Sequence, residues 1–184
     1  MKQQNYYEIT ISDKSVVLPI LPISPKLSIA FFNLHGNQEL TEHCAKNLLP
    51  LIKGADIIIT AESKGLQLAH CVARLLGHSL YAVARKTQKL YMQDGISVEV
   101  KSITTGDTQR LYLSAHDTKL IKGKKIAIID DVISTGGSLL GLEELVKKAG
   151  GQVFVKAAVL AEGEAAERED IKYLAKIPLF EQGE

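Results

Sequence analysis

Apolar positions along this chain follow two patterns that alternate with each other. Continuous apolar runs predict strands covered on both faces. They occur at Asp56–Thr60, Leu80–Ala84, Ile126–Ile129 and Val153–Leu160. Between these runs, apolar residues recur at helical spacing. The predicted helices extend from Asn37 to about Ile52, from Leu66 to Leu76 and from Leu139 to Ala149. This alternation is typical of an α/β fold with a parallel sheet flanked by helices.

The N-terminal segment, residues 1–36, shows a different pattern of apolar and polar residues. It alternates over Tyr6–Ile11, and three prolines at positions 19, 22 and 25 then interrupt an apolar stretch. Proline cannot donate to a sheet, so this segment is excluded from the centre of a parallel sheet. We expect a small cap, or hood, over the main sheet, with Phe31 and Phe32 either in the core or facing a ligand.

Residues 90–118 predict a β-hairpin. Ile96, Val98 and Val100 alternate with polar residues, Thr104–Asp107 has turn composition, and Gln109–Ser114 alternates again. An excursion of this length beside a site is often a lid that excludes water.

We interpret the whole chain as one domain. Its parts are the cap (1–36), the core (37–89 and 119–163), the lid hairpin (90–118) and a C-terminal tail (164–184), in which Tyr173–Phe180 returns as an edge strand.

Composition narrows the class of protein. A chain of 184 residues with 46% hydrophobic content can bury the core of one domain. The net charge of +1 does not indicate the broad positively charged surface that would bind nucleic acid. No apolar run reaches the length of a membrane span, and the N-terminus does not have the pattern of a signal peptide. Cys44 and Cys71 fall on apolar helix faces, as buried thiols of a cytoplasmic protein would. The histidines show no metal-ligand spacing, so no zinc site is expected.

The most specific motif is Asp130–Ser138, which joins a buried strand to a helix. Asp130 and Asp131 are adjacent carboxylates, which repel each other unless cations or hydroxyl donors meet them. Ser134–Ser138 follows with small side chains at a helix N-terminus, where unpaired N–H groups attract anions. Alone, such aspartates are usually helix caps and a Gly-Gly pair is usually a turn. Their combination predicts binding of a diol or metal beside a phosphate.

Two further segments leave predicted parallel strands. Glu62–Gly65 follows the strand 56–60, and Arg85–Lys89 follows the strand 80–84. Right-handed crossovers place the carboxyl ends of parallel strands at one edge of the sheet, where ligands bind. We therefore expect these segments to converge with Asp130–Ser138. Taken alone, Arg85–Lys89 would be a solvated basic turn.

Asp130–Ser138 resembles the signature of the type I phosphoribosyltransferases, which bind 5-phosphoribosyl-1-pyrophosphate (PRPP). Ala61–Gly65 is similar to the E-S-R-G form seen in adenine phosphoribosyltransferases, with Lys64 in place of the arginine. This exchange keeps the charge but loses the bidentate fork. Arg85–Leu90 is similar to the R-K-x-x-K-L stretch of the same enzymes, and Leu113–Gly123, with His116, matches their spacing. The resemblance covers about residues 55–163.

The resemblance implies transfer of a phosphoribosyl group from PRPP to a purine base, with Mg²⁺ as cofactor. It assigns catalytic roles to Asp130, Asp131, Lys64 and Arg85. Ribose 5-phosphate would be bound by Val132, Ile133, Ser134, Thr135, Gly136, Gly137 and Ser138. Pyrophosphate would be bound by Glu62, Ser63, Lys64, Gly65, Arg85, Lys86 and Lys89. Mg²⁺ would be held through the pyrophosphate, and Asp130 and Asp131 remain open as further ligands.

Base recognition departs from the pattern of adenine phosphoribosyltransferases, whose lid carries a glutamate in an L-E-Y-G stretch. Here the nearest acidic residue is Asp107, and the lid sequence is also similar to the xanthine phosphoribosyltransferase and purine-repressor branch. Phe32, Asp107 and Glu162 are the candidates for contacts with the base. The leading prediction is conversion of adenine and PRPP to AMP and pyrophosphate. Hypoxanthine, xanthine and guanine remain alternative bases.

A second class of function also remains open, namely a regulatory protein that senses PRPP without catalysis. The residues before the first core strand do not show the pattern of a winged-helix DNA-binding domain, and the cations expected to bind pyrophosphate are present. These features favour an enzyme. A dinucleotide-binding protein is disfavoured because no G-x-G-x-x-G follows a predicted strand. The resemblance further implies a homodimer with small-molecule substrates, and neither a nucleic-acid nor a membrane partner is expected.

Overall fold

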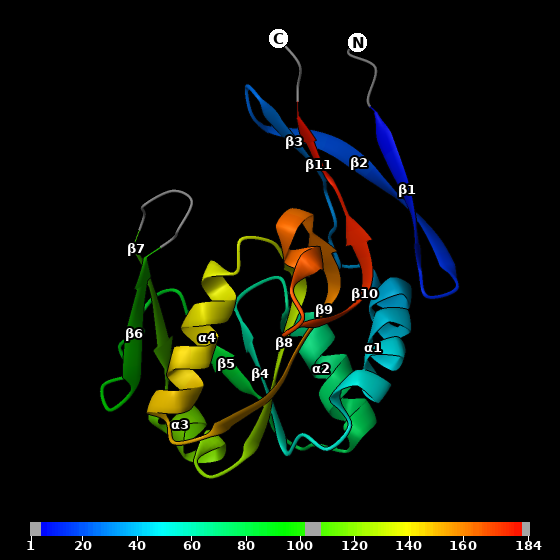
Figure 1. Ribbon diagram of the computed structural model, residues 1–184. Helices are drawn as coiled ribbons and strands as arrows, with labels where there is room; N and C mark the ends of the chain where they lie inside the picture. Colours follow the sequence, from blue (N-terminus) through cyan, green and yellow to red (C-terminus); the bar gives the residue numbers. More distant parts are fainter. Residues whose placement is uncertain (1–4, 102–107, 182–184) are drawn as a thin grey trace.

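The computed structural model describes residues 5–101 and 108–181, which form a central sheet, a cap sheet and a hairpin (Figure 1). The elements follow in the order β1 (Tyr6–Ile11), β2 (Lys14–Ser24), β3 (Leu27–Ala30), α1 (Gln38–Ile52), β4 (Ile57–Ala61), α2 (Leu66–Leu76), β5 (Ala82–Ala84), β6 (Ile96–Lys101), β7 (Thr108–Leu113), α3 (Ala115–Ile121), β8 (Lys125–Ile133), α4 (Gly137–Lys148), β9 (Gln152–Glu162), the 3₁₀-helix η1 (Gly163–Glu167), β10 (Lys172–Ile177) and β11 (Leu179–Glu181).

The central sheet has the strand order β10-β9-β8-β4-β5, and every neighbouring pair is parallel. Successive residues of β4 point to opposite faces: Ile58 packs in the core with α1 and α2, whereas Ile59 packs in the core with α4. Figure 1 shows α1 and α2 on one side of the sheet and α4 on the other. Because both faces are covered, the strands read as continuous apolar runs. The predicted α/β fold class is confirmed.

Strand β8 is longer than its apolar run. The sequence predicted that the chain leaves the sheet at Asp130, but β8 continues to Ile133. Asp130 pairs with Ala158 of β9, and Ile133 pairs with Ala161. The two aspartates therefore lie within the last part of a hydrogen-bonded strand. Backbone pairing with β9 overrides the polar character of their side chains.

Helix α4 agrees with its predicted apolar face. Leu139, Leu142, Leu145 and Val146 are buried against the sheet, and Lys147 and Lys148 occupy the last turn. Gly150 follows with a φ of 78°, a left-handed conformation that glycine adopts without strain. The helix begins at Gly137, before the predicted start at Leu139, and it ends at Lys148, with Ala149 as the capping residue.

The cap is an antiparallel sheet of order β1-β2-β3-β11. The sequence predicted one returning strand over Tyr173–Phe180, but Pro178 separates two strands. β10 pairs parallel with β9 in the central sheet, whereas β11 pairs antiparallel with β3 in the cap. The C-terminal segment therefore ties the cap to the core, which the prediction of a separate N-terminal cap did not include. Phe32 is 2% exposed and belongs to the core, while Phe31 is 37% exposed.

The predicted hairpin is formed by β6 and β7 in antiparallel register. It lies beside α4, and the backbone of Tyr112 exchanges hydrogen bonds with that of Arg85 after β5. A Cβ at Gly141 of α4 would lie 2.7 Å from Leu111 Cδ1, so glycine permits this close packing. The predicted turn Thr104–Asp107 lies outside the described residues. In the ranges that are described, no helix is long and apolar enough to cross a membrane.

Leu142→Ala is expected to lower the free energy of unfolding by about 2–5 kcal/mol, because it leaves a cavity at a fully buried position. Leu140 lies on the same helix but is 41% exposed. Leu140→Ala is therefore the matched control, with an expected change of about 0.5 kcal/mol. Urea unfolding followed by circular dichroism measures both. Equal losses in the two variants would contradict the assigned helix face.

Candidate functional site

Three segments that are distant in sequence meet at one edge of the central sheet. Glu62–Gly65 follows β4, Arg85–Lys89 follows β5, and Asp130–Ser138 spans the end of β8 and the start of α4. The strands β8, β4 and β5 are parallel neighbours, so their carboxyl ends lie side by side. The structure brings together the residues that the sequence predicted to converge.

Asp131 is the buried anion of this edge. Its side chain is 4% exposed, and its Oδ2 lies 3.1 Å from Nζ of Lys64. This contact is an ion pair rather than an aligned hydrogen bond, and within the described parts of the chain Oδ2 has no hydrogen-bond donor. Lys64 remains 45% exposed, and its Nζ also lies 5.8 Å from the centre of the Phe31 ring. A buried carboxylate with one mobile cation is poised to accept a further donor or cation.

Asp130 has a different environment. Its Oδ1 accepts a hydrogen bond from the backbone N–H of Asp131 (2.9 Å). Burial and the neighbouring charge of Asp131 raise the pKa of Asp130 to about 8. The two adjacent carboxyls therefore resist being charged at the same time, as close pairs of carboxylates do. A ligand with hydroxyl donors or a cation would relieve this repulsion.

Gly65 sets the distance between the β4 loop and β8. A Cβ at this position would lie 2.2 Å from Oγ1 of Thr60 and 3.3 Å from Oδ1 of Asp130. Any larger residue would push the loop away from the aspartates. Thr60 is fully buried, and its Oγ1 has no hydrogen-bond partner among the described residues. Glycine is thus required here for close approach rather than for a turn conformation.

Glu62 joins the two cationic loops. Its Oε2 accepts from a terminal nitrogen of Arg85 (3.0 Å), and its Oε1 accepts from the backbone N–H of Lys86 (2.8 Å). Burial opposes its charge, but these two hydrogen bonds and nearby cations hold the pKa of Glu62 below its ordinary value. Glu62 therefore orients the loop that carries Arg85. The side chains of Lys86 and Lys89 are exposed.

The start of α4 forms a small hollow of about 70 Å³. It is lined by Asp130, by Val132 and by every residue from Ile133 to Leu139. Gly136, the residue before the helix, has a φ of 79°, and the backbone N–H groups of the first turn follow it. A turn of this kind, opening onto unpaired N–H groups, suits a phosphate group.

A second hollow, of about 580 Å³, lies between the cap and this loop. Cap and tail residues line one part of it, and residues around the start of α4 and the end of β9 line the rest. The lining consists of Ile23, Leu27, Ser134, Thr135, Glu162, Glu164, Ala165, Arg168 and Leu179. Of the residues predicted to contact a base, Glu162 lines this hollow. Phe32 is buried in the core instead, and Asp107 lies outside the described residues.

The sequence did not indicate Ile23, Leu27, Leu179 or Arg168 as site residues. They come from the cap and the C-terminal segment, and the pairing of β11 with β3 brings those two parts together. The run of acidic residues at the end of β9 begins at Glu162. It contains η1, and Arg168 next to it turns toward the Gly136 loop.

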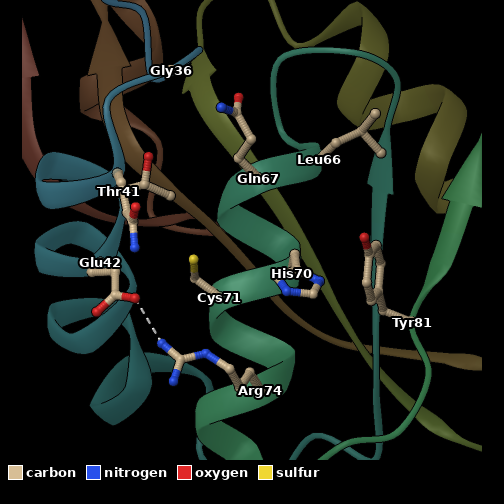
Figure 2. Close-up of a pocket in the computed structure, with 10 residues that line it drawn as sticks. Gly36, Thr41, Glu42, Leu66, Gln67, His70, Cys71, Arg74 and Tyr81 are labelled. Carbon is tan, nitrogen blue, oxygen red and sulfur yellow. Dashed lines mark hydrogen bonds and ion pairs between the residues drawn. The ribbon is translucent and has the colours of Figure 1, made fainter.

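A further hollow, of about 670 Å³, lies away from this edge between α1 and α2 (Figure 2). An ion pair between Glu42 and Arg74 (2.9 Å) crosses it. Cys71 lines this hollow and is only half-buried, so the prediction that both cysteines are buried is correct for Cys44 alone. Burial raises the pKa of Cys71, which keeps the thiol protonated.

The fold and the site define an α/β protein with a hollow suited to a phosphate at the carboxyl edge of a parallel sheet. Residues 33–182 match the family model of the phosphoribosyl transferase domain, and the chain belongs to this family. The resemblance identified from the sequence is thereby confirmed.

Relatives of this chain include enzymes for different purines. It is 33% identical over 147 residues to an adenine phosphoribosyltransferase of Thermotoga sp. (strain RQ2), covering 77% of this chain and 82% of the relative. It is 31% identical over 134 residues to a hypoxanthine/guanine phosphoribosyltransferase of Methanococcus voltae, covering 70% and 67%. A crystal structure of adenine phosphoribosyltransferase from Thermoanaerobacter pseudethanolicus superposes with a TM-score of 0.71 at 23% identity, covering 86% of this chain and 95% of that one. This last likeness shows the fold.

Asp130→Asn is expected to stabilise the protein increasingly as pH rises from about 4 to about 8. The folded state holds a proton on Asp130 up to about pH 8, whereas an unfolded aspartate loses it near pH 4. The free energy of unfolding of the wild type therefore falls as the pH rises through this range. The asparagine side chain of the variant does not titrate, so the variant does not lose this stability. We expect a difference of at least about 1 kcal/mol between pH 5 and pH 8.5 in urea unfolding. Asp94→Asn, at an exposed aspartate, is the control. Parallel pH profiles for Asp130→Asn and wild type would contradict the raised pKa.

Proposed function

We propose that this protein is a purine phosphoribosyltransferase that converts adenine and PRPP to AMP and pyrophosphate. The observation that carries the proposal is the meeting of the Asp130–Asp131 pair, the Ser134–Ser138 loop and the two cationic loops at one sheet edge. A pyrophosphorylated sugar phosphate has a matching set of groups, namely a diol, a 5′-phosphate and a pyrophosphate. Lys64 and Glu62 then connect these regions through their contacts with Asp131 and Arg85.

The chemistry replaces the bond between ribose C1 and pyrophosphate by a bond between C1 and a nitrogen of the base, and the proton on that nitrogen passes to the pyrophosphate or to solvent. Positive charge grows on the sugar as pyrophosphate leaves with the bonding electron pair. Asp130 and Asp131 would accept hydrogen bonds from the ribose hydroxyls, and the negative charge of Asp131 would favour the cationic transition state. Lys64, Arg85, Lys86 and Lys89 would hold the departing pyrophosphate. The protein's part is positioning and charge stabilisation.

The residues present fit Mg²⁺ as a cofactor. Asp131 Oδ2 has no hydrogen-bond donor among the described residues, and Asp130 is adjacent. No group of three or more potential ligands from His, Cys, Asp and Glu is found in the described part of the chain. Mg²⁺ commonly binds through one or two carboxylates together with substrate phosphates. When bound, it would neutralise charge on the pyrophosphate, and the two aspartates are the side chains that would hold it.

The choice of adenine is supported by the charge of the second hollow. Glu162 and Glu164 line it, and burial raises the pKa of Glu162. The carboxylate of Glu164 accepts hydrogen bonds, so it favours the amino group of adenine over the carbonyl oxygen of the 6-oxopurines. The relatives named for adenine agree with this preference. Hypoxanthine, guanine and xanthine remain alternatives, because relatives at 31% and 32% identity carry those names.

An assay with five bases tests the proposal. Pyrophosphate release is measured with protein, Mg²⁺ and PRPP, and with adenine, hypoxanthine, guanine, xanthine or orotate. Adenine is expected to give the highest kcat/KM. Preference for a 6-oxopurine would reject the assignment of adenine alone. Measurable PRPP binding with no turnover of any base would reject the enzyme and favour a PRPP-sensing regulator.

Asp131→Asn is expected to lower kcat by about 100-fold or more, because it removes the buried charge beside the developing cation. Circular dichroism and thermal unfolding check that the variant is folded. Asp56→Asn, at an aspartate outside the site, is the control and should retain activity. Unchanged turnover in a folded Asp131→Asn variant would show that this carboxylate does not serve the ribose.

We also propose that the protein acts as a homodimer in the cytoplasm. Leu90 and Tyr91 follow the Arg85–Lys89 loop and are 94% and 73% exposed. Adjacent large apolar residues this exposed favour a partner surface. Both cysteines are free thiols, as is usual in a reducing compartment. Sedimentation equilibrium is expected to give twice the chain mass for wild type and a weaker dimer for Leu90→Ser/Tyr91→Ser. A monomeric wild-type protein would contradict the dimer.

A further inference from the structure

Arg168 is held in a fixed orientation beside the Ser134–Ser138 loop. Its Nε donates to Oδ1 of Asp170 (2.9 Å), and one terminal nitrogen donates to Oδ2 of the same carboxylate (2.8 Å). Paired contacts of this kind fix the plane of the guanidinium. They also hold the pKa of Asp170 well below its ordinary value, together with Lys156. The side chain of Arg168 is 34% exposed, so it remains accessible from the second hollow.

Asp170 is itself anchored to the core. It accepts a hydrogen bond from Lys156 of β9, whose Nζ also lies 3.0 Å from Glu143 of α4. The Lys156 and Glu143 side chains are 13% and 18% exposed. The ion pairs therefore run from α4 through β9 to the segment before β10, and Arg168 is their outermost member.

The remaining terminal nitrogen of Arg168 points at the backbone of Gly136. A Cβ on Gly136 would lie 2.7 Å from it. Of the hydrogen bonds recorded for the described residues, none involves this nitrogen. Gly136 immediately precedes α4 and forms part of the small hollow that suits a phosphate. A free donor with a positive charge is thus presented at the edge of that hollow.

The loop itself carries no positive side chain. Asp130–Ser138 contains neither lysine nor arginine, so it offers only backbone N–H groups and hydroxyls to a phosphate. The proposed pyrophosphate cations follow β4 and β5, whereas Arg168 follows β9 on the other side of β8. Arg168 is the basic side chain among the residues that line the second hollow, which adjoins the loop at Ser134 and Thr135.

We propose that Arg168 binds the 5′-phosphate of the phosphoribosyl substrate and of the nucleotide product, and that Asp170 is the positioning residue for its guanidinium. This inference rests on the proposed function. It adds a charge-assisted contact to the neutral donors of the Ser134–Ser138 loop. The contact holds the 5′ end of the sugar in both the ground state and the transition state, so it serves binding more than the chemical step.

Calorimetry with two separate ligands tests the proposal. Ribose 5-phosphate probes the 5′-phosphate subsite, and pyrophosphate with Mg²⁺ probes the other end. Arg168→Gln is expected to weaken ribose 5-phosphate binding by about 10- to 100-fold, the usual loss of a charged hydrogen bond. Pyrophosphate binding should be unchanged. Arg168→Lys should retain part of the affinity, and Asp170→Asn should cause a smaller loss. Arg74→Gln, at an exposed arginine that likewise pairs with one acidic residue, Glu42, is the control.

Steady-state kinetics supplies a second readout. Arg168→Gln is expected to raise the KM for PRPP by a similar factor while kcat at saturating PRPP changes less than threefold. Unchanged ribose 5-phosphate affinity in a folded Arg168→Gln variant would overturn the proposal, and so would equal losses for both ligands, which indicate a general disturbance of the site. Wild-type protein that binds neither ligand would instead refute the proposed function, and the role of Arg168 with it.

Discussion

The repulsion between Asp130 and Asp131 is the constraint on which this site depends. Both carboxyls belong to the last part of β8, where pairing with β9 fixes the backbone. Asp131 is 3% exposed, so water does not screen it, and one half-exposed lysine is its nearest cation. Burial and this charge hold a proton on Asp130. Placing two carboxyls here therefore carries an electrostatic cost that a diol, a cation or a cationic transition state would relieve.

The neighbouring loops supply the cations that compensate for this repulsion. Gly65 lets the β4 loop approach Asp130 closely, which places Lys64 against Asp131. The Glu62 carboxylate accepts hydrogen bonds from Arg85 and from the backbone N–H of Lys86. These bonds fix the position of the loop after β5 relative to the loop after β4. The charges of the site thus form an alternating arrangement, in which each anion positions a cation. This is the electrostatic preorganisation that group transfer with developing charge requires.

The short C-terminal segment contributes strands to both sheets. β10 extends the central sheet and β11 extends the cap, with Pro178 between them. This short stretch therefore joins both sheets, in addition to the packing of Ile11 and Leu18 of the cap against α1. The hollow between the cap and the Ser134–Ser138 loop is lined from both sides as a result. Arg168 and Asp170 lie just before β10. The segment that lines one side of the hollow is therefore also the segment that forms ion pairs with Lys156 of β9, which in turn pairs with Glu143 of α4.

Local sequence determined the elements of this protein, because strand, helix and turn signals depend on adjacent residues. The apolar runs marked β4, β8 and β9, the spacing of leucines marked the buried face of α4, and Asp130–Ser138 marked the phosphate-type loop and its family. Convergence of the three loops also followed from sequence, since the carboxyl ends of parallel strands share one edge. Tertiary structure alone decided which of Phe31 and Phe32 is buried, how far β8 extends, and that Arg168 meets Gly136. Those outcomes depend on contacts between β9, the tail and the cap, and no local pattern encodes contacts between residues so far apart in the chain.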